Sequence, residues 1–144
     1  MKYTNETGRS MVEMLGVLAI IGVLSVGGIA GYTRAMRTWR ANEIIDAANK
    51  VVVQAETNDS GTANYADDVG DLTKVAGNVV ESIEATRASG GGTVAIALKN
   101  NTDAMQKVKA AIDDKMNNSD EANRRTLAKY VVTVTCGAPT PPEE

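Results

Sequence analysis

The sequence has no histidine and no phenylalanine, and Cys136 is its only cysteine among 144 residues. Histidine is the commonest general base and a frequent metal ligand, so its absence removes the usual basis of catalysis and of a metal centre. A single cysteine excludes an internal disulfide and any metal site built from several cysteines. The chain lacks the usual equipment of an enzyme, and we predict no catalytic, cofactor or metal site.

Aromatic residues and basic charge are also scarce. One Trp and four Tyr are the whole aromatic content, so a core must be built from Val, Ile, Leu and Ala. The net charge of -3 and the pI near 5.0 argue against a protein that coats nucleic acid, which needs a basic surface. A mass of 15.1 kDa leaves room for one small domain and an appendage.

One long apolar run dominates the N-terminal third. Residues 14–32 read MLGVLAIIGVLSVGGIAGY, with Ser25 as the only polar residue besides the terminal Tyr32. As a helix this run is roughly 28 Å long at ~1.5 Å per residue, which matches the hydrocarbon layer of a bilayer. The run therefore predicts a membrane-spanning helix. Two simpler interpretations stay open, a cleaved secretory signal and a plain single-span anchor.

Two features of the run suggest a more specific role. Glu13 lies at its start, where an ionised carboxylate is costly in lipid and usually has a partner. Small residues also let helices approach closely in lipid, and the run is rich in glycine. Gly27 and Gly31 have the four-residue spacing of close helix pairs. The candidate helix-packing residues are Gly22, Gly27, Gly28 and Gly31.

Residues 8–13, Gly-Arg-Ser-Met-Val-Glu, lead directly into the apolar run and resemble the class III signal of type IV prepilins and pseudopilins. In that family a prepilin peptidase cuts after a glycine, and the fifth mature residue is a glutamate. The resemblance covers about the first fifty residues. It implies cleavage between Gly8 and Arg9, with Glu13 in the fifth mature position. The family's first mature residue is usually apolar and often N-methylated, whereas Arg9 is charged.

The resemblance also implies a function. The chain would be a structural subunit of a type IV pilus-like filament, and the new α-amino group of Arg9 would neutralise Glu13 of a neighbouring copy. It would be a single-pass precursor in the bacterial inner membrane, then part of an extracellular or periplasm-spanning filament that serves adhesion or secretion. The implied partners are further copies of the chain, the prepilin peptidase, a pilus or type II secretion platform, and membrane lipid. A type II secretion pseudopilin and a plain membrane-anchored domain remain the alternatives.

Three arginines follow the apolar run. Arg34, Arg37 and Arg40 are spaced at i, i+3 and i+6, so they lie on roughly one face of a helix. The positive-inside rule alone would place the residues after the run in the cytoplasm. The family resemblance requires the opposite orientation, which we adopt because the cleavage motif is more specific. Their role stays open between binding lipid phosphates, binding acids of a neighbouring subunit, and a solvated face partly balanced by Glu43 and Asp46.

The overall pattern predicts an α+β fold. A long N-terminal helix, membrane-spanning in its first half, packs on a small antiparallel-sheet head with additional helices. After Tyr32 the apolar residues continue at helical spacing, and the turn formers of 57–64 end the helix. We expect a leader at 1–8, a helix at 9–56 beginning near Ser10, and a head at 57–144 with a mobile Pro-rich tail at 137–144. The apolar positions of the helix are Ala35, Met36, Trp39, Ile44, Ala47, Ala48, Val51 and Val52.

Within the head, the sequence predicts a short helix at 67–76, followed by a β-hairpin whose strands are 79–88 and 93–99. A longer helix is expected at 102–116, with Thr102 or Asp103 as its N-terminal cap. A short helix at 120–129 and a strand at 130–136 complete the head. The acidic residues around 58–59 and 67–71 do not have the spacing of a calcium loop. Cys136 falls on the apolar strand, where we expect it to be a small core residue.

Overall fold

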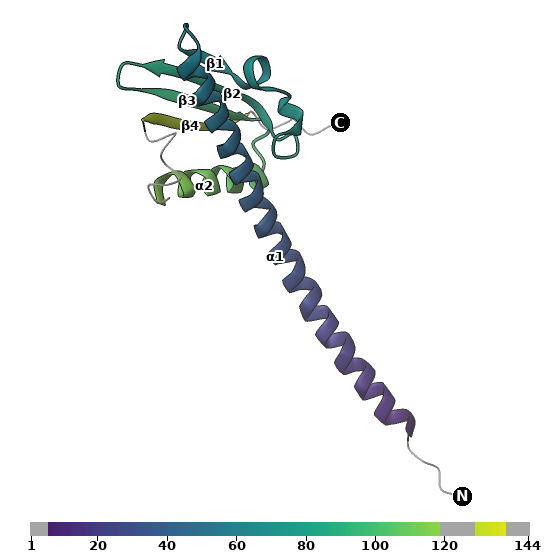
Figure 1. Cartoon of the computed structure of the whole chain (residues 1–144). Helices are drawn as coiled ribbons and strands as arrows, with labels where there is room; N and C mark the ends of the chain where they lie inside the picture. Colours follow the sequence, from purple (N-terminus) through teal and green to yellow (C-terminus); the bar gives the residue numbers. More distant parts are fainter. Residues whose placement is uncertain (1–5, 119–128, 138–144) are drawn as a thin grey trace, which may run out of the picture. The chain divides into compact units, whose positions relative to one another are not determined.

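A computed structural model of the chain describes residues 6–118 and 129–137. The protein has an α+β fold, as predicted, with a long N-terminal helix and a small four-stranded sheet (Figure 1). The chain divides into two units, Met1–Met36 and Arg37–Glu144. The first contains the N-terminal part of helix α1, and the second contains the rest of α1 and the head.

Helix α1 runs from Glu6 to Thr57 as one α-helix of 52 residues. It begins four residues before the predicted start at Ser10, so the predicted cleavage site after Gly8 lies within its first turns. No proline interrupts this segment, and the many Ala, Leu and Met residues favour helix. The helix ends in a turn in which the N–H of Gly61 donates to the carbonyl of Asn58 at 3.0 Å.

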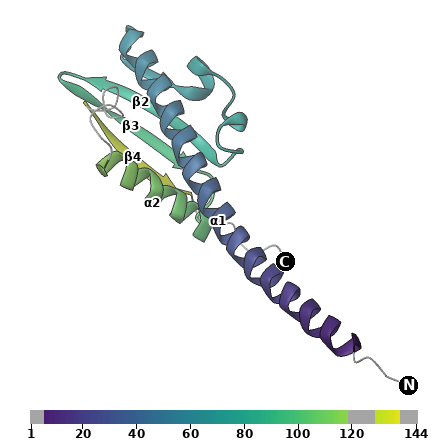
Figure 2. The ribbon, with the colours of Figure 1, turned by 60° about the horizontal axis from the view of Figure 1, so that its bottom comes forward.

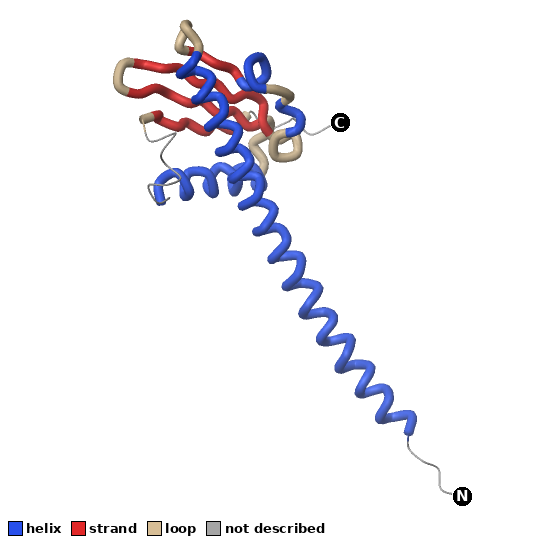
Figure 3. The backbone as a smooth tube through the Cα atoms, viewed as in Figure 1, coloured by secondary structure: helices blue, strands red, loops and turns tan. Residues whose placement is uncertain are grey.

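The sheet has the strand order β1-β2-β3-β4 (Figure 3). Its strands are β1 (Thr62–Asn64), β2 (Val80–Ala88), β3 (Gly91–Leu98) and β4 (Tyr130–Cys136). The pairs β1–β2 and β2–β3 are antiparallel, whereas β3–β4 is parallel. The expected antiparallel sheet is therefore a mixed one. Helix α2 (Asp103–Asn118) lies between β3 and β4 in the chain, and parallel strands need such a crossover.

The β2–β3 hairpin was predicted, and it closes through Ser89 and Gly90. Gly90 has a φ of +89°, the left-handed conformation that glycine adopts without strain in tight hairpin turns. Strand β3 starts at Gly91, two residues before the predicted start. A Cβ at Gly91 would meet the carbonyl of Lys129, and a Cβ at Gly92 would meet the ring of Tyr130. The glycines thus allow the beginning of β4 to lie close against β3.

One face of the sheet forms the core of the second unit. Both α1 and α2 place their apolar stripes in the same buried cluster as this face, so the two helices cover one side of the sheet (Figure 2). The predicted packing of α1 on the head is confirmed, and residues 41–55 of the helix contribute to this core. Burial of these aliphatic side chains, at roughly 25 cal/mol per Å² of apolar surface, supplies the main stabilisation. The fully buried side chains of the cluster include Ile44, Val51, Val52, Val80, Ile83, Val94, Ile96, Leu98, Val108 and Ile112.

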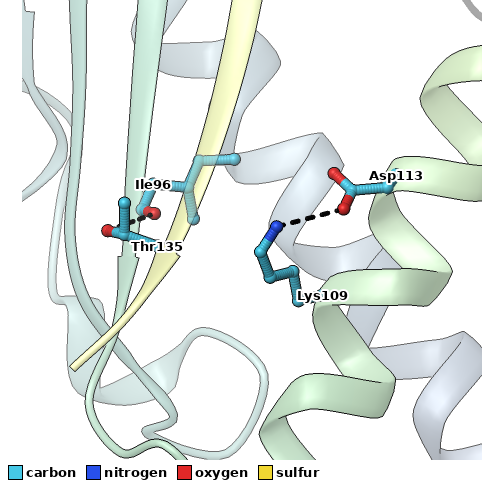
Figure 4. Close-up of polar contacts among 4 residues, drawn as sticks. All are labelled: Ile96, Lys109, Asp113 and Thr135. Atoms are coloured by element: carbon cyan, nitrogen blue, oxygen red, sulfur yellow. Dashed lines mark hydrogen bonds and ion pairs between the residues drawn. The ribbon is translucent and has the colours of Figure 1, made fainter. Parts of the chain in front are cut away.

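Polar contacts reinforce the α2–β4 part of the head (Figure 4). The hydroxyl of Thr135 donates to the carbonyl of Ile96 at 3.4 Å and so links β4 to β3. On α2, Nζ of Lys109 lies 3.3 Å from a carboxylate oxygen of Asp113, one turn further along. The helix begins as predicted, because Thr102 Oγ1 accepts a hydrogen bond from the N–H of Met105 at 3.4 Å.

The remaining predictions for the head have mixed outcomes. Residues 62–64 form a strand rather than a turn. The helix predicted at 67–76 is wrong: a π-helical turn, Tyr65–Val69, and a 3-10 turn, Leu72–Lys74, stand there instead. They are separated at Gly70, whose φ of 158° is not helical. Cys136 is half-buried and packs against the core. The helix predicted at 120–129 and the tail predicted at 137–144 fall outside the described residues, except Lys129 and Gly137.

Candidate functional site

The first unit presents an exposed apolar surface. Between Met11 and Ile29, the large apolar side chains of α1 are 52% to 75% exposed. A soluble protein rarely leaves so much contiguous apolar surface in water, and such a surface normally contacts lipid or another protein. These side chains are Met11, Val12, Met14, Leu15, Val17, Leu18, Ile20, Ile21, Val23, Leu24, Val26 and Ile29.

Helix α1 is the one helix among residues 6–118 and 129–137 that is long and apolar enough to cross a membrane. The core helix of a soluble protein can have the same length and composition. None of this apolar stretch is buried in the protomer, however. The structure thus places near the N-terminus a helix that could cross a bilayer once, which agrees with the membrane-spanning helix that the sequence predicts.

Two hydroxyl groups of the first unit form hydrogen bonds within the helix. Ser25 donates to the carbonyl of Ile21 at 2.7 Å, and Thr33 donates to the carbonyl of Ala30 at 3.0 Å. In hydrocarbon an unsatisfied hydroxyl is costly, because no water can replace the missing partner. These bonds let both side chains lie in lipid or between packed helices at little cost.

Glu13 lies on the same helix, between the exposed apolar side chains of Val12 and Met14. The predicted processing residues, Gly8 and Arg9, also lie in α1, between one and one and a half helical turns before Glu13. A single helix therefore carries the cleavage motif, the carboxylate and the apolar run 14–32 in that order. This arrangement keeps the carboxylate about 6 Å along the axis from residue 9, at ~1.5 Å per residue.

Within the protomer, no neighbouring atom requires glycine at these positions of α1. A Cβ added at Gly22, Gly27, Gly28 or Gly31 would meet nothing within 4 Å. Alanine would fit at each position and would favour the helix by about 1 kcal/mol. Close contact with another helix is a use that small residues serve in lipid, and the packing role of these glycines stays a prediction.

The segment after the apolar run carries both aromatic and basic side chains. Tyr32 is 65% exposed and Trp39 is 48% exposed. The sequence pattern placed Trp39 on the apolar face of α1 that packs on the head, together with Ile44, but the structure buries only Ile44 fully. The carboxylate of Asp46, which the sequence offers together with Glu43 as a counter-charge for the arginines, lies 3.0 Å from Nζ of Lys50.

A polar groove of about 430 Å³ lies along β1 and the end of β2 in the head. Two of its carboxylates take part in local structure: Asp68 accepts from the N–H of Asn64 at 2.8 Å, and Glu84 accepts from the side-chain amide of Asn64 at 3.2 Å. In the part of the chain that the structure describes, no group of three His, Cys, Asp or Glu could hold a metal ion.

Comparison with protein-family models, with curated proteins and with solved structures finds no match to this chain. The functional interpretation therefore depends on the motif at residues 8–13 and on the exposed apolar surface of α1.

Proposed function

We propose that the chain is a structural subunit of a type IV pilus-like filament. It is made as a prepilin, held in the bacterial inner membrane by α1, cut after Gly8 and assembled through the same helix. The observation that carries this proposal is the exposed apolar helix of the protomer, preceded at fixed spacing by Gly8, Arg9 and Glu13. The proposed role is structural and needs no enzymatic site.

Cleavage would prepare the subunit for assembly. The cut gives Arg9 a new α-amino group, a cation that the precursor does not have at this position. Between packed apolar helices, an uncompensated Glu13 carboxylate would cost several kcal/mol. An amine of a neighbouring copy at ~4 Å would attract it by about 4 kcal/mol at an effective dielectric constant of 20. The pair would fix the register between subunits, while apolar packing supplies most of the association.

The surface of α1 suits two successive environments. Before assembly, its exposed aliphatic side chains contact lipid tails. After assembly, they contact the helices of neighbouring copies, and Gly27 and Gly31 allow close approach. Both environments exclude water, so the chain leaves the bilayer without exposing this surface to solvent. The filament would extend outside the cell or across the periplasm.

A type II secretion pseudopilin is the alternative within the same class, because it would use the same helix in a shorter filament. A plain single-span anchor is the alternative outside it. In a plain anchor the leader stays uncut and Glu13 is dispensable. Genes for a secretion ATPase and several pseudopilins beside this one would favour the secretion role.

The experiment that tests the proposal is determination of the mature N-terminus. Intact mass and N-terminal sequencing are compared between cells with and without a prepilin peptidase. A start at Arg9 that requires the peptidase supports prepilin processing. A chain that keeps Met1, or that is cut after Ala30 as a secretory signal would be, contradicts it.

A further inference from the structure

The proposed cut after Gly8 removes the first residues of α1. The helix begins at Glu6, so residues 6–8 of the leader belong to it. In an α-helix each N–H donates to the carbonyl four positions earlier. The carbonyls of residues 6–8 therefore serve the N–H groups of Ser10, Met11 and Val12 in the uncut chain. Cleavage takes these acceptors away.

The donors that lose their partners lie on an apolar part of the helix. The side chains of Met11 and Val12 are 70% and 69% exposed in the protomer, and they belong to the surface that contacts lipid or neighbouring helices in the proposed function. A backbone N–H without an acceptor is costly there, because hydrocarbon holds no water to replace the lost partner. The cut helix therefore needs new acceptors at its new start.

The sequence supplies acceptors at this position. Ser10 and Glu13 have the Ser-x-x-Glu spacing of a capping box, and the apolar run follows directly. In this motif the serine hydroxyl accepts from the N–H three residues further on, and the glutamate accepts from the N–H of the serine. A cap residue has an extended backbone, whereas Ser10 of the uncut chain lies inside α1. The motif can therefore act as a cap only after cleavage.

We propose that cleavage converts Ser10 from a helical residue into the N-cap of α1, and that Ser10 then positions the carboxylate of Glu13 for assembly. The hydroxyl of Ser10 accepts the N–H of Glu13, and one carboxylate oxygen of Glu13 accepts the N–H of Ser10. The second carboxylate oxygen stays available to the amine of a neighbouring copy. Ser10 is thus a positioning residue that acts through Glu13.

The capping box prepares both partners of the proposed contact between subunits. Helical side chains point back toward the N-terminus, so Glu13 is directed toward Ser10. A carboxylate that is already held loses less side-chain freedom when the amine of a neighbour binds. The mature helix starts at Met11, which leaves the α-amino group of Arg9 outside the helix and able to reach another copy. The inference rests on the proposed function in that the mature chain must begin at Arg9.

The test compares the uncut chain with a chain that begins at Arg9, both in phosphatidylcholine nanodiscs. An engineered protease site in place of residues 1–8 yields the second chain without a prepilin peptidase. The NMR chemical shifts of Cα and Cβ of Ser10 report its backbone conformation. We expect helical shifts in the uncut chain and extended shifts in the chain that begins at Arg9. Helical shifts of Ser10 in both chains would overturn the proposal.

The decisive variant is Ser10→Ala in the chain that begins at Arg9. Alanine cannot accept the N–H of Glu13, so exchange of this amide with solvent should become about fivefold faster, the typical effect of losing a cap. Ser10→Thr keeps a hydroxyl and should restore slow exchange. The matched control is Ser25→Ala, because the Ser25 hydroxyl bonds the carbonyl of Ile21 at 2.7 Å and is remote from the cut. Equal exchange in Ser10→Ala and Ser10→Thr would refute the capping role.

A further variant separates the capping box from the charge of Glu13. Glutamine also completes a capping box but does not attract an amine as a carboxylate does. Glu13→Gln should therefore keep the extended shifts of Ser10 while filaments are lost in cells. Cells that leave the leader uncut would contradict the proposed function, and the chain that begins at Arg9 would still decide the capping box. Extended shifts that disappear in Glu13→Gln would overturn the box.

Discussion

The phenol of Tyr130, at the start of β4, donates a hydrogen bond of 2.6 Å to a carboxylate oxygen of Glu56, in the last turn of α1. On the same residue of α1, the backbone carbonyl accepts a hydrogen bond of 2.9 Å from Nη1 of Arg87 on β2. The last carbonyls of a helix have no partner within it. The end of α1 is thereby tied to two strands that are remote in sequence.

Replacing Tyr130 by Phe removes the hydrogen bond to Glu56 and keeps the ring beside Gly92. We expect the free energy of unfolding to fall by about 1 kcal/mol, the typical net value of one hydrogen bond. Urea denaturation of both proteins at pH 7 measures the difference. The control is Thr133→Ala, which alters an exposed side chain on the same strand. An unchanged midpoint for Tyr130→Phe would show that the bond contributes nothing.

The same residue predicts a pH dependence. Burial, followed by the hydrogen bond to Glu56 and the charge of Glu56, raises the pKa of Tyr130 from 10.0 to about 12. A raised pKa means that the folded state favours the neutral phenol. The resulting stabilisation is fully present below pH 10 and is lost as the pH rises from 10 to about 12.

Denaturation midpoints across this range check the pH prediction. Other tyrosines and lysines also titrate there, so the informative quantity is the difference between the wild-type chain and Tyr130→Phe. That difference should shrink as the pH rises from 10 to about 12. Absorbance at 295 nm should also show one phenol that ionises later than the others in the folded protein. A difference that stays constant up to pH 12 would contradict the assignment.

The long helix and the hairpin could be predicted because their signals are local. Apolar periodicity defines α1, and the glycines after Ser89 define the turn between β2 and β3. The bond between Tyr130 and Glu56 joins residues separated by 74 positions, and no local pattern contains it. The parallel direction of β4 was missed for a related reason: a strand such as 130–136 has the same alternation in either direction.

Two further differences have physical causes. Strand β1 has only three residues, which is too few to show alternation among turn formers. Predicting a helix at 67–76 ignored Gly70, whose extended backbone separates two short turns. The exposure of Trp39 could not be read from periodicity, because α1 passes there from an exposed segment to a buried one. Processing at Gly8 and assembly through Glu13 stay predictions, and they depend on the motif alone.

Gly92→Ala should destabilise the head strongly. A Cβ at this position would overlap the Tyr130 ring and the carbonyl of Thr86, and both are fixed by the sheet. Overpacking of this kind costs roughly 1–3 kcal/mol. The control Thr93→Ala changes the exposed neighbour on β3 and should have a small effect. Thermal unfolding of both variants measures the contrast, and equal melting temperatures would contradict the close approach of β4.

Glu13→Ala should separate processing from assembly. The substitution lies beyond the cut, so the mature chain should still begin at Arg9. Membrane insertion should be retained, because alanine is cheaper in lipid than a carboxylate. Filaments should be sparse or absent, because up to about 4 kcal/mol of attraction to a neighbour's amine is lost.

Sheared filaments and membrane fractions, quantified by immunoblot, check the Glu13 prediction. The control Glu81→Ala removes an exposed carboxylate of β2 in the head. Filaments at wild-type levels in Glu13→Ala would refute the proposed role of this carboxylate, while leaving the membrane anchor intact.

The double substitution Gly27→Ala with Gly31→Ala tests whether α1 packs against other copies. In the protomer neither added methyl group meets an atom within 4 Å, so folding and membrane insertion should be unaffected. The helix itself should become more stable by about 1 kcal/mol per position. Assembly should nevertheless weaken, because the methyl groups keep neighbouring helices apart. Filament yield is compared with that of Ser25→Ala, which changes a residue on the opposite side of the helix. A double variant that assembles as well as the wild-type chain would show that these glycines do not lie at a helix contact.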